Sequence, residues 1–122
     1  MFDPEFYPTP ANVAHDMCAL VDIQGKVVLE PHAGKGDLIN IIKEYNPKEI
    51  LSCEKNRDLA SICSNISTFI GDDALLLSKE DIAHVDIIIA NPPFSMLKHI
   101  YVTYGILRLV DVLLYHYVTM RL

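Results

Sequence analysis

Residues 26–46, "KVVLEPHAGKGDLINIIKEYN", carry the clearest fold signal in this chain. This stretch begins with a short apolar run rich in β-branched residues, 26–30, which is typical of a strand buried on both faces. "PHAGKG" then supplies two glycines for a tight turn. "DLINIIKEYN" repeats apolar residues at helical spacing until Asn46 and Pro47 end the pattern. The stretch therefore predicts a strand, a glycine-rich turn and a helix in direct succession.

The same rhythm continues on both sides of this stretch. Prolines at positions 4, 8 and 10 keep residues 1–10 extended. We expect further helices at 11–21, 56–65 and 96–108, and further strands at 49–54, 66–70, 86–90 and 110–118. Strands that alternate with helices form right-handed βαβ units and a parallel sheet. The expected fold is α/β and Rossmann-like: a mostly parallel sheet of about five strands, with helices on both faces.

Length and composition set further limits. A chain of 122 residues, 51% of them hydrophobic, fits a single globular domain over 1–122. The net charge of −6 means that any nucleic-acid contact must come from a local patch or a partner. The three cysteines lack metal spacing and are interpreted as reduced thiols of a cytoplasmic protein. We expect no membrane span, because Arg108, Asp111 and His116 interrupt the C-terminal apolar run.

The turn after the first strand is a candidate ligand site. Gly34 and Gly36 allow a tight turn and a close approach of a ligand to the backbone. The third glycine of a dinucleotide fingerprint is missing, and no Gly-Lys-Ser/Thr follows as in a phosphate loop. Glu30 would repel a diphosphate and suits a cationic amine instead. The five histidines of the chain are scattered, so we assign no metal site. His32 lies inside the turn, where it could touch a ligand, but we expect it to face solvent.

Acidic residues follow the next two strands. Glu54 ends the second strand, where one carboxylate is able to accept hydrogen bonds from both hydroxyls of a ribose. Asp72 and Asp73 follow the third strand. One of them accepts a hydrogen bond from an adenine amino group, with Asp73 preferred, or simply caps the next turn.

"NPPF" follows the fourth strand. The Asn91 side-chain carbonyl and the Pro92 backbone carbonyl are acceptors, Pro93 stiffens the loop, and Phe94 offers a flat apolar face. Two acceptors and a ring suit a planar amino group. The alternative is a Pro-Pro turn with a buried phenylalanine.

Together these motifs resemble the S-adenosylmethionine-dependent amino-methyltransferases, specifically the adenine-N6 DNA methyltransferase branch. "NPPF" resembles the catalytic D/N/S-P-P-Y/F motif of that family. "LEPHAGKGDL" resembles its E/D-P-x-x-G-x-G cofactor loop, and "FYPTP" resembles the segment that closes over the methionine moiety. The order of the motifs resembles the gamma-type enzymes of phages and restriction systems. The match covers residues 5 to about 95.

The resemblance implies a Rossmann-like class I methyltransferase sheet and a role for each matching residue. Asn91, Pro92, Pro93 and Phe94 would form the catalytic motif. The cofactor S-adenosylmethionine would be bound at its methionine side by Phe6, Tyr7, Thr9, Pro10, Glu30, Pro31, Ala33, Gly34 and Gly36. Glu54 would take its ribose hydroxyls and Asp73 or Asp72 its adenine. The implied target is adenine in DNA.

The chain departs from the family after the catalytic motif. Only 27 residues follow Ser95, so two C-terminal strands and a target-recognition region are missing, and we expect a truncated enzyme. Three hypotheses stay open: an adenine DNA methyltransferase, a methyltransferase acting on RNA or on a protein glutamine, and a non-catalytic cofactor-binding subunit. The third would dimerise, or bind a second chain, through its unfinished sheet edge.

Overall fold

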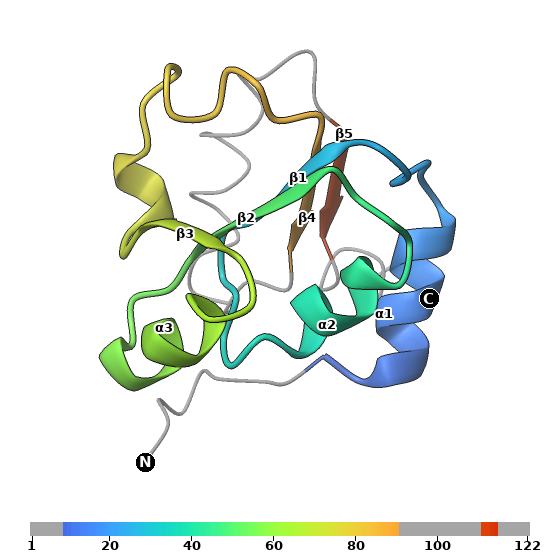
Figure 1. The fold of residues 1–122 in the computed structure, drawn as a ribbon, viewed down its shortest axis with the longest axis horizontal. Coiled ribbons are helices and arrows are strands. Elements are labelled where there is room, and N and C mark those ends of the chain that lie inside the picture. Colours follow the sequence, from blue (N-terminus) through green and yellow to red (C-terminus); the bar gives the residue numbers. More distant parts are fainter. Residues whose placement is uncertain (1–8, 91–110, 115–122) are drawn as a thin grey trace.

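The computed structural model describes residues 9–90 and 111–114. Its sheet has five strands in the order β3-β2-β1-β4-β5, and every neighbouring pair is parallel (Figure 1). The strands are β1 (Val27–Glu30), β2 (Glu49–Cys53), β3 (Thr68–Gly71), β4 (Ile87–Ala90) and β5 (Asp111–Leu114). All residues of β1 and β4 are buried, as expected for central strands of a parallel sheet.

Three α-helices pack against one face of the sheet: α1 (Ala11–Ala19), α2 (Asp37–Lys43) and α3 (Arg57–Cys63). Their apolar side chains form one core cluster with alternate residues of the central strands, including Val28 and Ile89. The other face carries a second cluster, in which Leu29 and Ile88 contact Ile82 and Val85. A short 3₁₀ helix, η1 (Ala74–Leu76), opens the segment that leads to this second cluster.

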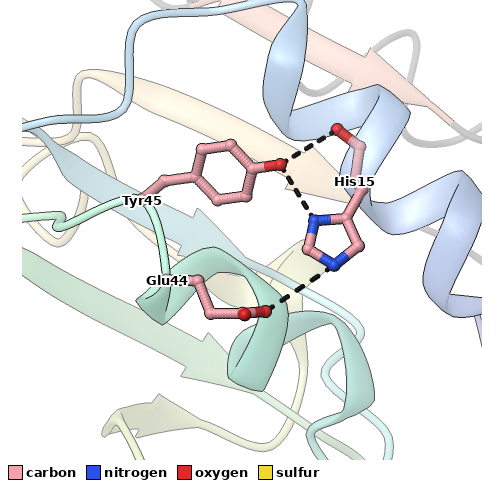
Figure 2. A network of polar contacts seen from close by, with 3 residues as sticks. All are labelled: His15, Glu44 and Tyr45. Carbon is pink, nitrogen blue, oxygen red and sulfur yellow. Dashed lines mark hydrogen bonds and ion pairs between the residues drawn. The ribbon is translucent and has the colours of Figure 1, made fainter.

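Helix α1 is joined to the end of α2 by a polar network (Figure 2). His15 Nδ1 lies 2.9 Å from the Tyr45 hydroxyl, and His15 Nε2 lies 3.7 Å from a carboxylate oxygen of Glu44. The contact fixes the helix that directly follows residues 9 and 10, which were expected to line a ligand. The network is exposed to solvent, so its contribution to stability is small.

The strand order reverses at β1. From β1 the chain continues outward to β2 and β3, whereas β4 lies on the opposite side of β1. Asp86 stabilises the start of the β1–β4 pairing, since its side chain accepts a hydrogen bond from the Val27 amide at 2.9 Å. In open parallel sheets, ligands bind at the carboxyl ends of the strands beside such a switch point. Glu30 ends β1 and Ala90 ends β4, so the edge of the sheet beside these two residues is where a ligand site is expected.

The expected fold class is confirmed: the sheet is parallel and Rossmann-like, with helices between its strands. The three α-helices of the described residues lie on one face, so helices on both faces stay a prediction. The expected strands and helices within the described residues all occur, with ends that differ by a few positions. The helix expected at 96–108 lies outside the described residues. Within the described part of the chain, no helix is long and apolar enough to cross a membrane.

The N-cap of α3 gives a first prediction. The Asn56 side chain accepts hydrogen bonds from the amides of Asp58 and Leu59, at 3.0 and 3.1 Å. Asn56→Ala is expected to lower the free energy of unfolding by about 1 kcal/mol, because both amides lose their acceptor. Urea unfolding measures the loss, with Asn40→Ala, an exposed position within α2, as the control. Equal midpoints for the two variants would show that the cap contributes nothing.

Candidate functional site

The β1–α2 turn forms the centre of the candidate site. Gly34 and Gly36 both adopt positive φ angles, 58° and 95°, which side chains disfavour. A Cβ atom on Gly36 would also collide with the Ile66 side chain. The turn is tied to the neighbouring strand, since the Ala33 amide donates to the Cys53 carbonyl at 3.0 Å. The glycines are therefore required by the backbone path of the turn, as the sequence predicted.

Glu54 connects this turn to the start of α3. One carboxylate oxygen accepts a hydrogen bond from the Gly34 amide, and the other accepts one from the Asn56 amide, both at 2.8 Å. A carboxylate has about four lone-pair positions, so two stay available after these bonds. The side chain is half-buried at the carboxyl end of the sheet. It is held in one orientation and keeps acceptors for two hydroxyl groups.

Glu30 is a fully buried acid at the end of β1, with 1% of its surface exposed. Its carboxylate accepts a 2.7 Å hydrogen bond from the His32 amide. Burial raises the pKa of Glu30 from 4.5 to about 8, the charge of Glu54 adds to this, and the His32 amide opposes it. The carboxyl group is therefore mostly protonated at neutral pH, and a cationic group beside it would restore its charge.

The environment of His32 differs from the one that the sequence predicted. It was expected to face solvent, but its Nε2 atom is buried and has no hydrogen-bond partner among the described residues. Burial lowers the pKa of His32 to about 4, the positive charge of Lys55 adds to this, and Asp73 acts against it. The expectation was wrong because the turn folds back over β2, which places the imidazole beside residues distant in sequence. No local sequence signal indicates that contact.

Asp73 already has partners. One carboxylate oxygen caps η1 by accepting from the Leu75 amide at 3.0 Å, and the other lies 3.7 Å from Lys55 Nζ. The capping alternative therefore describes a contact that Asp73 makes, although its remaining lone pairs are able to accept a ligand hydrogen as well. Asp72 beside it is exposed.

Some of the other predicted site residues lie within the described part of the chain, and some lie outside it. Pro31 and Ala33 are buried in the turn, while Thr9 and Pro10 precede α1, where Pro10 is the N-cap residue. The remaining predicted residues lie outside the described residues: Phe6, Tyr7, Asn91, Pro92, Pro93 and Phe94. The described residues thus bring together Glu30, Ala33, Gly34 and Glu54. Within the same residues, no group of three or more acidic, histidine or cysteine side chains is placed to hold a metal ion.

The polar groups at this edge fit S-adenosylmethionine. A buried acid suits the amine of the methionine part, and Glu54 keeps lone pairs for a ribose diol. The buried, unpartnered Nε2 of His32 is a polar atom that a bound ligand would satisfy. The two acids therefore match two different chemical groups of the same molecule, and the imidazole adds a third polar atom at the same edge.

No protein-family model and no curated protein matches the chain. Solved structures do match it. One is a candidate RNA methyltransferase from Pyrococcus horikoshii, with 28% identity and a TM-score of 0.61 over 73% of this chain and 48% of that one. Another is an RNA methyltransferase from Salinibacter ruber in complex with S-adenosyl-L-homocysteine, with 16% identity, a TM-score of 0.64, and coverage of 80% and 71%. A dimethyladenosine transferase from Plasmodium falciparum has 15% identity, a TM-score of 0.73, and coverage of 89% and 42%.

The fold is therefore the Rossmann-like fold of S-adenosylmethionine-dependent methyltransferases. S-adenosylmethionine is the cofactor of this structural class, and the fit of the site agrees with it. The chain spans about half the length of the Pyrococcus structure that it matches.

Proposed function

We propose that the chain binds S-adenosylmethionine at the carboxyl edge of its sheet and transfers the methyl group to the N6 amine of adenine in DNA. The observation that carries the cofactor part is the Glu54 carboxylate, held 2.8 Å from the Gly34 amide with lone pairs to spare. This contact joins the glycine turn to the acid that follows β2, and Glu30 lies at the end of the adjacent strand.

Each residue has a defined task in this proposal. Glu30 would hold the ammonium group of the methionine part, and Glu54 the two ribose hydroxyls. Asp73, or Asp72, would accept from the adenine amine of the cofactor. Phe6, Tyr7, Thr9 and Pro10 would close the methionine side, with Thr9 at its carboxylate. When bound, the cofactor supplies a methyl group made electrophilic by a positively charged sulfur.

The catalytic motif would hold the target amine. The Asn91 and Pro92 oxygens would accept the hydrogens of that amine and turn its lone pair toward the methyl group, while Phe94 stacks on the base. A base in a duplex would have to be flipped out first. Support comes from the order of the motifs and from β4, which ends at Ala90 beside the switch point and directly precedes the motif in the sequence. Because the net charge of the chain is −6, contact with DNA would have to come from a local patch or from a partner chain.

RNA is the second candidate substrate. The specific observation in its favour is the 28% identity to a candidate RNA methyltransferase. A transfer assay with radiolabelled cofactor separates the substrates, using adenine-containing duplex DNA, single-stranded DNA, RNA of the same sequence and a glutamine-containing peptide. Label in DNA supports the proposal. Label only in RNA or only in the peptide would show that DNA is not the substrate and would identify the substrate class instead. Cofactor binding without transfer to any of them favours a non-catalytic subunit, and sedimentation would then reveal whether it dimerises.

Calorimetric titration with S-adenosylhomocysteine tests the cofactor site itself. We expect micromolar binding by the purified chain and unchanged binding by Glu80→Gln. Glu80 is exposed and lies between η1 and β4 in the chain, outside the proposed site. Absence of binding by a folded chain would overturn the proposed cofactor site.

Asn91→Ala is expected to separate binding from transfer. Loss of the side-chain acceptor is expected to lower the rate of transfer by at least about a hundredfold, because the target amine loses its orientation. The dissociation constant for S-adenosylhomocysteine is expected to stay within about twofold. An equal loss of both quantities would assign Asn91 to the cofactor rather than to the target.

A further inference from the structure

The His32 imidazole has a ring nitrogen that makes no hydrogen bond within the described part of the chain. Its backbone amide is satisfied by Glu30, but its Nε2 atom is buried and has no partner among the described residues. Buried polar atoms in folded proteins nearly always have a hydrogen-bond partner, so an unpaired one needs an explanation. A ligand that occupies the site is the explanation that the position of the turn favours.

The surroundings of the imidazole indicate which part of a ligand it meets. The charges that act on it belong to Lys55, directly after Glu54, and to Asp73, after β3. These two side chains form an ion pair, and they lie on the β2 and β3 side of the turn. That side is where the proposed function puts the ribose and the adenine. The amine of the methionine part is assigned to Glu30, in the body of the sheet.

The protonation state of His32 agrees with contact to a neutral group. With its pKa lowered to about 4, the ring is uncharged over the physiological range. A neutral imidazole has one donor and one acceptor nitrogen, and which of them is Nε2 depends on the tautomer. Adenosine presents ring-nitrogen acceptors, an amine and hydroxyl groups, so either tautomer finds a complementary atom on it.

We propose that His32 determines specificity for the nucleoside: its Nε2 hydrogen-bonds the adenosyl part of the bound cofactor, between Glu54 and the Lys55–Asp73 ion pair. This inference rests on the proposed function, because it assumes that the cofactor binds at the glycine turn. It adds a residue that the motif comparison left without a role.

The test uses two variants of the full chain and two ligands. His32→Leu substitutes an apolar side chain of similar bulk and removes the hydrogen bond, whereas His32→Gln keeps a polar group near the position of Nε2. The ligands are S-adenosylhomocysteine and 5′-methylthioadenosine, which has the nucleoside without the amino-acid part. His84→Leu is the matched control, since His84 is exposed and precedes β4 at the amino edge of the sheet.

We expect His32→Leu to weaken the binding of both ligands by about tenfold, the effect of one lost hydrogen bond. His32→Gln is expected to recover most of the loss, and His84→Leu to bind like the natural chain. Urea unfolding of the free His32→Leu chain is expected at the same or a higher midpoint, because an unpaired buried nitrogen has been removed. A purely structural role for His32 would instead lower that midpoint.

Three results would overturn the inference in different ways. Unchanged affinity of His32→Leu for both ligands removes His32 from the site while the proposed function stands. A loss for S-adenosylhomocysteine alone moves His32 to the methionine side. Failure of the folded natural chain to bind either ligand overturns the proposed function and this inference together. If His32→Leu does not fold, nitrogen NMR of the natural chain decides: the His32 Nε2 resonance must move on adding 5′-methylthioadenosine, while that of His84 stays.

Discussion

Glu30→Gln is expected to stabilise the folded chain and to abolish cofactor binding. The carboxyl group is buried, and its pKa rises from 4.5 in the ordinary state to about 8 in the folded chain. Below pH 4.5 the Glu30 carboxyl group is protonated in both the folded and the unfolded chain, so its burial does not lower stability there. Between pH 4.5 and 8 the unfolded chain releases the proton and the folded chain keeps it, so stability falls as pH rises. A neutral glutamine of nearly the same shape removes this loss.

The size of the effect follows from the width of that pH range. At about 1.4 kcal/mol per pH unit, the gain in the free energy of unfolding amounts to roughly 2–4 kcal/mol at pH 7. It is expected to vanish near pH 4. Urea unfolding of both chains at pH 4, 7 and 8 measures it, with Glu80→Gln as the exposed control. A constant difference across these pH values would mean that Glu30 is ionised in the folded chain.

Binding is expected to change in the opposite direction. An ammonium group beside Glu30 needs the carboxylate form, so the natural chain should release a proton on binding at pH 7. Its affinity for S-adenosylhomocysteine should rise between pH 7 and 8 as Glu30 ionises. Titrations in phosphate and Tris buffers detect the released proton. Glu30→Gln should lose at least about a hundredfold in affinity, since removing one partner leaves the ligand charge buried and unpaired. A stable variant that still binds tightly would place the amine elsewhere.

Glu54→Ala is expected to lower both the stability of the folded chain and its affinity for the ligand. Removing the carboxylate leaves the Gly34 and Asn56 amides without their acceptor, at a cost of about 2 kcal/mol in the free energy of unfolding. It also removes the acceptors for the ribose hydroxyls, so affinity for S-adenosylhomocysteine should fall by at least about thirtyfold. Urea unfolding and calorimetry measure the two losses.

Glu54→Gln separates the two roles of this residue. The amide oxygen of glutamine replaces one of the two carboxylate oxygens that accept from the backbone amides, so the loss of stability should be about half of that in the alanine variant. Affinity should still fall strongly, because the charge and half of the acceptor positions are gone. Normal affinity in Glu54→Ala, in a chain that is still folded at the assay temperature, would contradict the ribose assignment.

Much of the architecture follows from local pattern. The alternation of apolar strands with helical repeats predicted the parallel sheet, and the glycines at 34 and 36 predicted the turn. The carboxyl ends of parallel strands meet at one edge, so Glu30 and Glu54 were expected to lie near each other there. These inferences need only the period of the side chains and the direction of the chain, both of which are written in consecutive residues.

The state of each polar group was decided by tertiary structure alone. Burial raises the pKa of Glu30, and the His32 Nε2 atom is buried within reach of the charges of Lys55 and Asp73. Nothing in "EPHAG" indicates whether the Nε2 atom of this imidazole is buried or exposed. Desolvation and hydrogen bonding depend on atoms contributed by other strands, about 20 residues or more away in the chain, which local periodicity does not record. The sequence by itself therefore determined the frame of the site, and only the packing of β1, β2 and β3 determined its protonation and its unused hydrogen-bonding groups.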